Sequence, residues 1–276
     1  MLDSSESGGR LKLYRFQPLV IPGDDRLSLL QQGQIWVSDS KTFNDPFDLH
    51  PRIKNLVPDR WSCGPAFDTD MCRALACLLE NPNLYQGALF IDSELAGEFQ
   101  AWADRADDEL DWDTRLRNAI EARIAQFGVV CLTPQWDNRL MWAHYASNGQ
   151  GFCVEYEVEP FNHTQEFQYV PVQYASEMPS LCLTEAMFTP HQFLQRVMAT
   201  KHADWAYERE IRLVCLNEKA KPVAVADQFV RITGLIAGYS MPTALLEPMK
   251  TTAARLGVKA FRINAKVTGA FSKEVL

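Results

Sequence analysis

Hydrophobic and polar residues alternate in several short stretches of the chain, which is typical of β-strands with one buried face. The first strand is expected at 12–19, with Tyr14 and Phe16 on one face, and a second at 34–40. Between them, "DDRLSLLQQG" has the spacing of a short helix that ends at Gly33. The chain is therefore expected to begin with a strand, a helix and a strand.

The second half of the chain is richer in strand patterns. Strands are expected at 129–133, 152–158, 170–175, 209–216, 229–238 and 258–267. A short helix is expected at 139–149, a longer helical stretch at 183–208, and a helix from about Ser240 to Gly257. Because strands follow both hairpin-like and helical connections, the fold class is predicted to be α+β, with a mixed, largely antiparallel sheet.

Residues 60–127 carry helical periodicity and many acidic side chains, interrupted at Asn81-Pro82. This stretch is interpreted as a helical insertion with a solvated acidic face. No repeat, low-complexity tract or linker separates it from the rest. The whole chain, 1–276, is therefore predicted to be a single domain.

Composition indicates a soluble globular protein, because 47% of the residues are hydrophobic and only 22% are charged. A net charge of -8 argues against a general binder of nucleic acids or anionic membranes. No apolar run resembles a signal peptide or a membrane span, so a cytoplasmic location is expected. The seven cysteines lack CxxC spacing and the five histidines lack HExxH spacing, which predicts packed thiols and no metal site.

Nucleotide-binding folds with a glycine-rich phosphate loop are not expected. No GxGxxG follows a predicted strand, and no GxxxxGK[ST] is present.

The stretch "WAYEREIRLVCL", residues 205–216, places two carboxylates at the start of an apolar strand. Strand alternation would put Glu208, Glu210 and Arg212 on one face, which fits the lip of a cleft at the edge of a sheet. Arg212 can neutralise one carboxylate and leave the other available to stabilise positive charge. An ordinary surface pair of Glu210 and Arg212 is the alternative.

Two further stretches gather polar and aromatic residues. "SDSKTFNDPFD", residues 38–48, is either a plain turn whose side chains cap their own backbone or a loop packed down to form a site. "QWDNRLMWAHYASNGQGFCVEY", residues 135–156, places Trp142 and Tyr145 on one helical face, with His144 to the side. These aromatic residues form either core or a wall on which a planar ring stacks, oriented by His144 or Tyr145.

Four motifs, "LYRF", "SKTFNDPFD", "LMWAHYASNGQGFCVEY" and "WAYEREIRL", resemble in order those of a bacterial family of domains of unknown function, number 2971 in that series. The resemblance extends from about 12 to 265. The family name itself implies no chemistry.

A weaker resemblance is to the ADP-ribosyltransferases, which have a split sheet and use NAD as substrate. It rests on "YR" in the first strand, Ser-x-Ser in the second and Glu-x-Glu before a late strand. The resemblance implies that Arg15 binds the diphosphate of NAD, that Ser38 or Ser40 supports the nicotinamide ribose, and that Glu210 is catalytic with Glu208 as its companion. Trp142 and Tyr145 would then pack the nicotinamide.

This resemblance leads to the expectation of an NAD-consuming transferase that modifies a protein or a nucleic acid, as a toxin, an effector or a phage-defence component. Asn44, Asp45, His144 and Arg212 complete the candidate NAD site. Two alternatives stay open. One is a non-enzymatic module that recognises a nucleotide or a partner through Asn44, Asp45, His144 and Glu208. The other is a metal-dependent nuclease, which would need Asp45, Asp48, Glu208 and Glu210 to converge.

Overall fold

The computed structural model describes residues 9–18, 26–49, 124–160, 167–177, 190–216, 218–225, 229–265 and 269–276. Contacts divide the chain into two compact units. The described residues of the first unit belong to Met1–Thr42, Phe127–Val172 and Asp204–Leu276. Those of the second belong to Phe43–Gln126 and Gln173–Ala203. The helical insertion predicted at 60–127 lies outside the described residues as far as residue 123.

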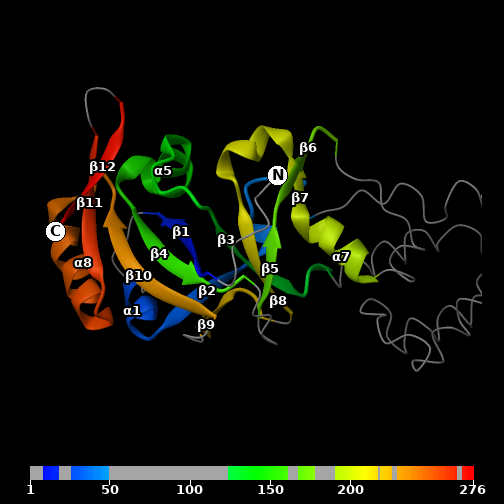
Figure 1. Cartoon of the computed structure of the whole chain (residues 1–276), viewed down its shortest axis with the longest axis horizontal. Coiled ribbons are helices and arrows are strands. Elements are labelled where there is room, and N and C mark those ends of the chain that lie inside the picture. The colour runs from blue at the N-terminus through cyan, green and yellow to red at the C-terminus, as the bar shows by residue number, and fades with distance from the viewer. Residues whose placement is uncertain are drawn as a thin grey trace, which may run out of the picture. The chain divides into compact units, whose positions relative to one another are not determined.

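One sheet of the first unit has five strands in the described ranges. Their order is β1 (Leu11–Gln17), β4 (Phe152–Val158), β10 (Val230–Ala237), β11 (Lys259–Ala265) and β12 (Phe271–Val275). Only the pairing of β10 with β11 is parallel among these strands. The helix α8 (Thr243–Leu256) connects these two strands, as a parallel crossover requires. Figure 1 shows the strands side by side.

A second sheet of the same unit also has five strands in the part of the chain that is described. Their order is β5 (Gln168–Pro171), β8 (Ile211–Leu216), β3 (Phe127–Leu132), β2 (Gln34–Asp39) and β9 (Lys221–Ala224). All of these pairings are antiparallel. The fold is therefore α+β with mixed, largely antiparallel sheets, which confirms the predicted class.

Among the described residues, one isolated bridge joins the two sheets. The Tyr14 amide donates to the Thr133 carbonyl at 2.7 Å, and the Thr133 amide donates to the Tyr14 carbonyl at 2.9 Å. Since Tyr14 lies within β1 and Thr133 follows β3, the first strand of the chain touches both sheets.

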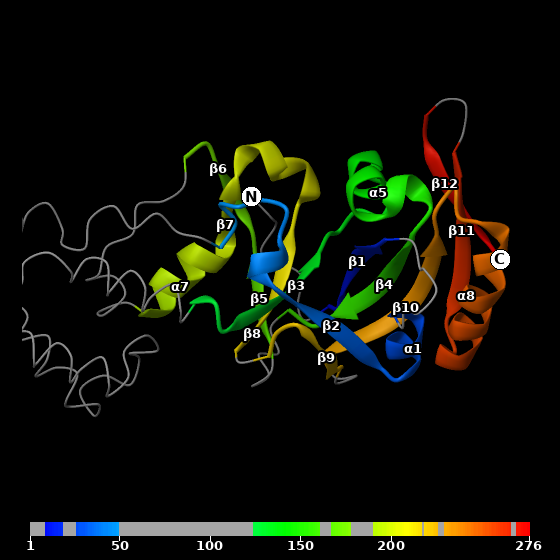
Figure 2. The ribbon, with the colours of Figure 1, turned by 180° about the vertical axis from the view of Figure 1, so that it is seen from behind.

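Two helices of the first unit pack against each other. The Gln31 side chain at the end of α1 (Arg26–Gln31) donates to the Thr252 hydroxyl in α8 at 2.8 Å. It also accepts a hydrogen bond from Arg255 at 2.7 Å. Figure 2 shows α1 and α8 close together beside β10 and β11. As predicted, α8 ends at Gly257, whose φ of 67° is favourable for glycine.

Buried apolar residues of the first unit form two clusters. The larger one combines both sheets with α1 and α8, and it includes Leu13 and Tyr156. The smaller one lies under α5 (Arg139–Tyr145) and includes Tyr14, Phe16 and Trp142. Because side chains alternate along β1, Leu13 faces the larger cluster and its two aromatic neighbours face the smaller one.

The turn before β4 depends on a glycine. Gly149 ends the 3-10 helix η4 (Ser147–Gly149) with a φ of 79°. A Cβ atom at Gly149 would lie 2.2 Å from the Tyr239 ring, so a side chain cannot fit there without displacing that ring. The expected turn after the aromatic helix is therefore a tightly packed one.

The second unit contains the strands β6 (Gln173–Ala175) and β7 (Thr200–His202), which pair in parallel. The helix α7 (Pro190–Ala199) comes directly before β7. The prediction of helix throughout 183–208 is thus wrong at residues 200–202, because β7 pairs with a strand that is distant in the sequence. Residues 203–208 form the 3-10 helix η5 (Ala203–Glu208), and residues 183–189 lie outside the described residues. None of the described helices is long and apolar enough to cross a membrane.

Among the described strands, β7, β9 and β12 were not predicted, and the single strand predicted at 170–175 is divided between β5 and β6, which belong to different sheets. Strand β7 is three residues long, and β9 and β12 lie at the edges of their sheets. Pro222 lies within β9, and "FSKEV" in β12 is half polar. Edge strands tolerate proline and charged side chains, so their sequences lack a clear strand pattern.

Candidate functional site

The three charged residues predicted to share a face in the stretch 205–216 do not share one strand. Glu208 ends the 3-10 helix η5 (Ala203–Glu208), and β8 begins only at Ile211. Arg209 between them has a φ of 48°, so the chain turns sharply before Glu210. The prediction of an alternating row at an open cleft lip is therefore wrong: Glu208, Glu210 and Arg212 are 3%, 4% and 0% exposed.

Glu210 and Arg212 form a buried ion pair. The Arg212 Nε donates to Glu210 Oε1 at 2.8 Å, and its Nη2 donates to Oε2 at 3.1 Å. Such two-point pairing fixes both side chains. The alternative of a pair between Glu210 and Arg212 holds for the two partners but not for a surface location, because both side chains are buried. Removing one partner would leave the other charge in the interior.

Glu208 is held by the aromatic helix α5. The Tyr145 hydroxyl donates to Glu208 Oε1 at 2.5 Å across 63 residues of sequence. Asn138 positions this helix, because its side-chain oxygen accepts hydrogen bonds from the amides of Leu140 and Met141 at the start of α5. The side-chain nitrogen Nδ2 of Asn138 also donates to the Tyr207 carbonyl in η5, at 2.6 Å. One cap residue therefore ties the helix with Tyr145 to the segment with Glu208.

His144 lies on the exposed side of the same contact. Its Nδ1 is 2.9 Å from the Tyr207 hydroxyl, and the two rings meet edge to face with centroids 5.8 Å apart. The His144 and Tyr145 side chains thus reach neighbouring residues of η5.

Trp142 is a core residue. Its side chain is 0% exposed, and its ring meets Phe16 edge to face at 4.9 Å. Its indole nitrogen donates to the Trp136 carbonyl at 2.6 Å. The prediction that Trp142 offers a stacking surface to nicotinamide is wrong, because no face of the ring is open; the core-packing alternative holds.

Arg15 and Ser38 are brought together by β1 and β2. The Arg15 Nη1 donates to the Trp36 carbonyl at 2.6 Å, and its Nη2 donates to the Ser38 hydroxyl at 3.4 Å. Burial lowers the pKa of Arg15; Tyr156 and Cys131 act to raise it, and Arg26 lowers it further. The two hydrogen bonds therefore hold the Arg15 guanidinium against β2.

The register of the second sheet relates Arg15 to the ion pair. Arg212 is paired directly with Cys131, and Ser38 is paired with Val129, so alternation puts these side chains on one face. Arg15 binds Ser38 and interacts electrostatically with Cys131. Both predicted arginines therefore approach the same face of β3, the strand between β2 and β8.

The remaining predicted residues play local roles in the structure. Ser40 begins the 3-10 helix η1 (Ser40–Thr42) and is 4% exposed. Asn44 and Asp45 belong to the second unit, where Asn44 is exposed. The Asp45 carboxylate accepts a hydrogen bond from the Phe47 amide at 2.9 Å, and its carbonyl accepts one from the Asp48 amide. Asp45 thus closes its own turn, as the punctuation alternative requires.

Asp48 belongs to a buried ion pair of the second unit. Its Oδ2 lies 3.4 Å from the Lys201 Nζ in β7, and both side chains are at most 5% exposed. Within the described residues, no group of three or more histidine, cysteine, aspartate or glutamate side chains could hold a metal ion. The carboxylate set of the nuclease alternative therefore does not form a ligand cluster, and two of its members are paired with cations.

Sequence reasoning missed a buried polar cluster around Glu155 in β4. Its carboxylate accepts hydrogen bonds from Tyr14 at 3.2 Å, Thr233 at 3.0 Å, Lys12 at 3.3 Å and Lys273 at 3.2 Å. Burial alone raises the pKa of Glu155, but hydrogen bonds and positive charge from Lys273, Thr233 and Lys12 outweigh it and lower the pKa. In the sequence, this cluster was indicated only by Glu155 itself, an acidic residue between apolar neighbours in the predicted strand at 152–158.

A family model described as a protein of unknown function (DUF2971) matches residues 141–213. No curated protein and no solved structure matches the chain. The match supports the resemblance to the DUF2971 family over this segment. It begins within α5 and ends within β8. The DUF2971 segment therefore contains both sides of the contact between Tyr145 and Glu208, and the ion pair of Glu210 with Arg212.

Proposed function

We propose that this protein is an NAD-consuming enzyme of the ADP-ribosyltransferase type, which transfers ADP-ribose to a protein or a nucleic acid. The observation that carries the proposal is that Arg15 with Ser38 and Arg212 with Glu210 approach one face of β3. An NAD site requires a cation for the diphosphate and a carboxylate for the ribose. Arg15 can supply the cation, and the turn that leads to Glu210 carries a second carboxylate, Glu208.

Cleavage of the bond between nicotinamide and ribose develops positive charge on the ribose. A fixed carboxylate lowers the energy of that state, and a hydroxyl held near the ribose helps to orient it. Ser38 can take the second role, because it already accepts a hydrogen bond from Arg15 and keeps its own proton to donate.

The geometry favours Glu208 for the catalytic role that the resemblance assigns to Glu210. Both Glu210 oxygens accept hydrogen bonds from Arg212, so its charge is largely compensated. One Glu208 oxygen accepts a hydrogen bond from the Tyr145 hydroxyl, and this contact orients the carboxylate. Glu210 then acts as a positioning residue for the turn that carries Glu208.

Release of nicotinamide from labelled NAD tests the function. Wild-type protein and Glu157→Gln, which changes a partly exposed carboxylate of β4, are expected to release nicotinamide at the same rate. Glu208→Gln is expected to lower the rate by about a hundredfold or more, in line with the loss of one electrostatic group. Absence of NAD binding in calorimetry would overturn the proposal.

A second function is favoured by the burial of Glu208 and Glu210, each at most 4% exposed. Carboxylates so enclosed suit a non-enzymatic module that binds a nucleotide and transmits its presence to a partner. For that module, calorimetry is expected to detect NAD binding, whereas no nicotinamide is released with any acceptor.

A further inference from the structure

The ammonium group of Lys273 in β12 lies among three aromatic rings. Its Nζ is 4.8 Å from the ring centroid of Phe261 in β11, 5.3 Å from that of Trp136 and 5.8 Å from that of Tyr14 in β1. A cation within about 6 Å of a ring centroid is attracted to the negative face of the ring. The rings of Phe261, Trp136 and Tyr14, which are distant in the sequence, therefore form an aromatic cage around one positive charge.

A buried carboxylate contacts the same ammonium group. The Glu155 Oε2 atom lies 3.2 Å from the Lys273 Nζ, and the Glu155 side chain is only 6% exposed. The Tyr14 hydroxyl donates to this oxygen at 3.2 Å, and burial together with the Glu155 charge raises the pKa of Tyr14, so the phenol stays neutral. Aromatic cages recognise ammonium groups of the choline and methyl-lysine type, and the carboxylate supplies the opposite charge.

Lys273 enters the aromatic cage from the edge of a sheet. Among the described strands, β12 pairs only with β11, and Figure 1 shows it beside that strand. No residue of β12 is fully buried, and the Lys273 side chain is 26% exposed. Segments with few buried contacts open at a low cost in free energy. Lys273 can therefore leave the cage without disruption of the core.

A primary ammonium group is not the best occupant of an aromatic cage. The lysine ammonium is a strongly hydrated point charge, and it gives up water when it lies between rings. A quaternary ammonium ion has no N–H groups to hydrate and presents methyl groups to the ring faces. The main advantage of Lys273 is that it is attached to the same chain, which gives it a high effective concentration.

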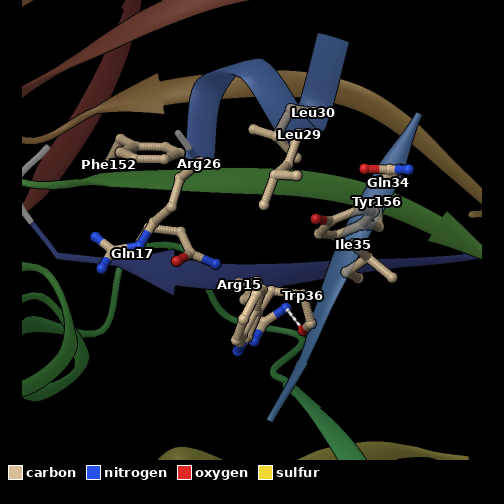
Figure 3. Close-up of a pocket in the computed structure, with 10 residues that line it drawn as sticks. All are labelled: Arg15, Gln17, Arg26, Leu29, Leu30, Gln34, Ile35, Trp36, Phe152 and Tyr156. Atoms are coloured by element: carbon tan, nitrogen blue, oxygen red, sulfur yellow. Dashed lines mark hydrogen bonds between the residues drawn. The ribbon is translucent and has the colours of Figure 1, made fainter. Parts of the chain in front are cut away.

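The aromatic cage is separate from the cation of the proposed NAD site. Tyr14 and Arg15 are neighbours in β1, so their side chains point to opposite faces of the strand. Figure 3 shows Arg15 beside Trp36, whose carbonyl accepts its hydrogen bond at 2.6 Å. Tyr14 instead belongs to the smaller apolar cluster. A ligand in the cage therefore leaves Arg15 available.

We infer that the aromatic cage binds an alkylated ammonium group in competition with Lys273. The ligand places its cation among the three rings and takes over the contact with Glu155. Lys273 then turns into solvent, and β12 is held less firmly on β11. This binding site does not depend on the proposed function.

Calorimetry tests the cage with choline and with its neutral analogue dimethylbutanol, in which a tert-butyl group replaces the trimethylammonium group. Wild-type protein is expected to bind choline at least about tenfold more tightly than the alcohol, because only choline carries the charge. Lys273→Ala removes the internal competitor and is expected to bind choline at least about tenfold more tightly than the wild type. Adding Trp136→Leu to Lys273→Ala is expected to weaken choline binding by about tenfold.

Lys12→Ala is the matched control. The Lys12 Nζ lies 3.3 Å from the other oxygen of Glu155, but its side chain is 59% exposed. Because an exposed charge contributes little, this variant is expected to bind choline within about twofold of the wild type. A tenfold gain in Lys12→Ala would show that any loss of positive charge near Glu155 is enough, and it would overturn the competition with Lys273.

Hydrogen exchange of the wild type tests the displacement of Lys273 without any variant. Saturating choline is expected to speed exchange of the β12 amides and to leave β4 unchanged, whereas dimethylbutanol is expected to change neither strand. Unchanged exchange in β12 with choline bound would overturn the competition. Equal affinity of the wild type for choline and the alcohol, or equal choline affinity of Lys273→Ala and the wild type, would overturn the ammonium site itself.

The alkylated ammonium group can belong to a small molecule or to a methylated lysine of a protein. A short peptide that contains trimethyllysine distinguishes these sources. Tighter binding of the peptide than of choline supports the site and assigns its ligand to a protein. Equal or weaker binding of the peptide supports the site with a small ammonium compound as its ligand.

Discussion

The side chains of Glu210 and Arg212 bind each other through two hydrogen bonds inside the first unit, at 2.8 and 3.1 Å. Two residues apart in the sequence, they form the ion pair next to the predicted reaction centre. Their burial makes the pair a structural requirement for any function of the site, because neither charge can reach bulk water if its partner is removed.

Arg212→Met is expected to destabilise the protein by about 3–5 kcal/mol, because it leaves the Glu210 carboxylate buried without its cation. The free energy of unfolding in urea measures this effect. The double variant Glu210→Leu/Arg212→Met removes both charges and is expected to regain much of the loss.

The control for that measurement is Arg231→Met, which breaks the exposed pair with Glu157. Its cost is expected to be about 1 kcal/mol or less. Equal destabilisation by the two single variants would contradict the burial argument.

Tyr145→Phe is expected to cost about 1–3 kcal/mol of stability, because the Glu208 carboxylate loses a donor in a buried place. Nicotinamide release is expected to fall as well, since the carboxylate is no longer oriented. Urea unfolding and the release assay measure the two effects. Tyr169→Phe, which changes a half-buried tyrosine of β5, is the control for loss of a hydroxyl, and an equal effect of both variants on release would argue against the assigned role.

Asp48→Asn is expected to destabilise the second unit by about 3–5 kcal/mol, because Lys201 keeps a buried charge without its partner. Hydrogen exchange is expected to become faster in β7 and in the turn at 46–49. Glu247→Gln breaks an exposed pair with Lys250 in α8 and is expected to leave these rates unchanged. Unchanged exchange in Asp48→Asn would refute the structural role of the pair.

Acid is expected to destabilise the wild type through Glu155. Its pKa in the folded protein lies below the ordinary value of 4.5, so the folded state binds fewer protons than the unfolded state as the pH falls through that range. The stabilisation is fully present above pH 4.5 and is lost as the pH falls below it, toward the lowered pKa.

Glu155→Gln removes this titration, so its free energy of unfolding is expected to fall less steeply than that of the wild type below about pH 4.5. Chemical unfolding at a series of pH values checks the difference in slope. Glu157→Gln, on the same strand but more exposed, is expected to follow the wild type. If the free energy of unfolding of Glu155→Gln fell with pH as steeply as that of the wild type, the acid sensitivity would not arise from the Glu155 carboxylate.

Local patterns predicted much of the described fold. Alternation identified β1, β2 and β4, and glycine and proline signals gave the limits of α8. The edge strands β9 and β12 were not predicted. An edge strand tolerates proline and polar residues, so its sequence lacks a clear strand pattern.

The candidate site was predicted less well than the fold. Residue types and local spacing indicated that Glu210 and Arg212 would pair, and that Tyr145 and His144 would act near each other. They did not indicate burial, which depends on the packing of several elements. The sequence around Trp142 fits both a core residue and a residue that stacks on a ligand. The structure decides for the core, because the ring is 0% exposed and packs against Phe16.

The sequence by itself determined the α+β class, most strand and helix positions, and the charged motif before β8, because these follow from periodicity and turn chemistry within a few residues. Only the tertiary structure decided that Glu208 leaves the strand at Arg209, that it binds Tyr145 across 63 residues, and that Arg15 reaches Ser38. Those relationships depend on the register and crossing of two sheets, and no local pattern encodes the geometry of a contact between distant segments.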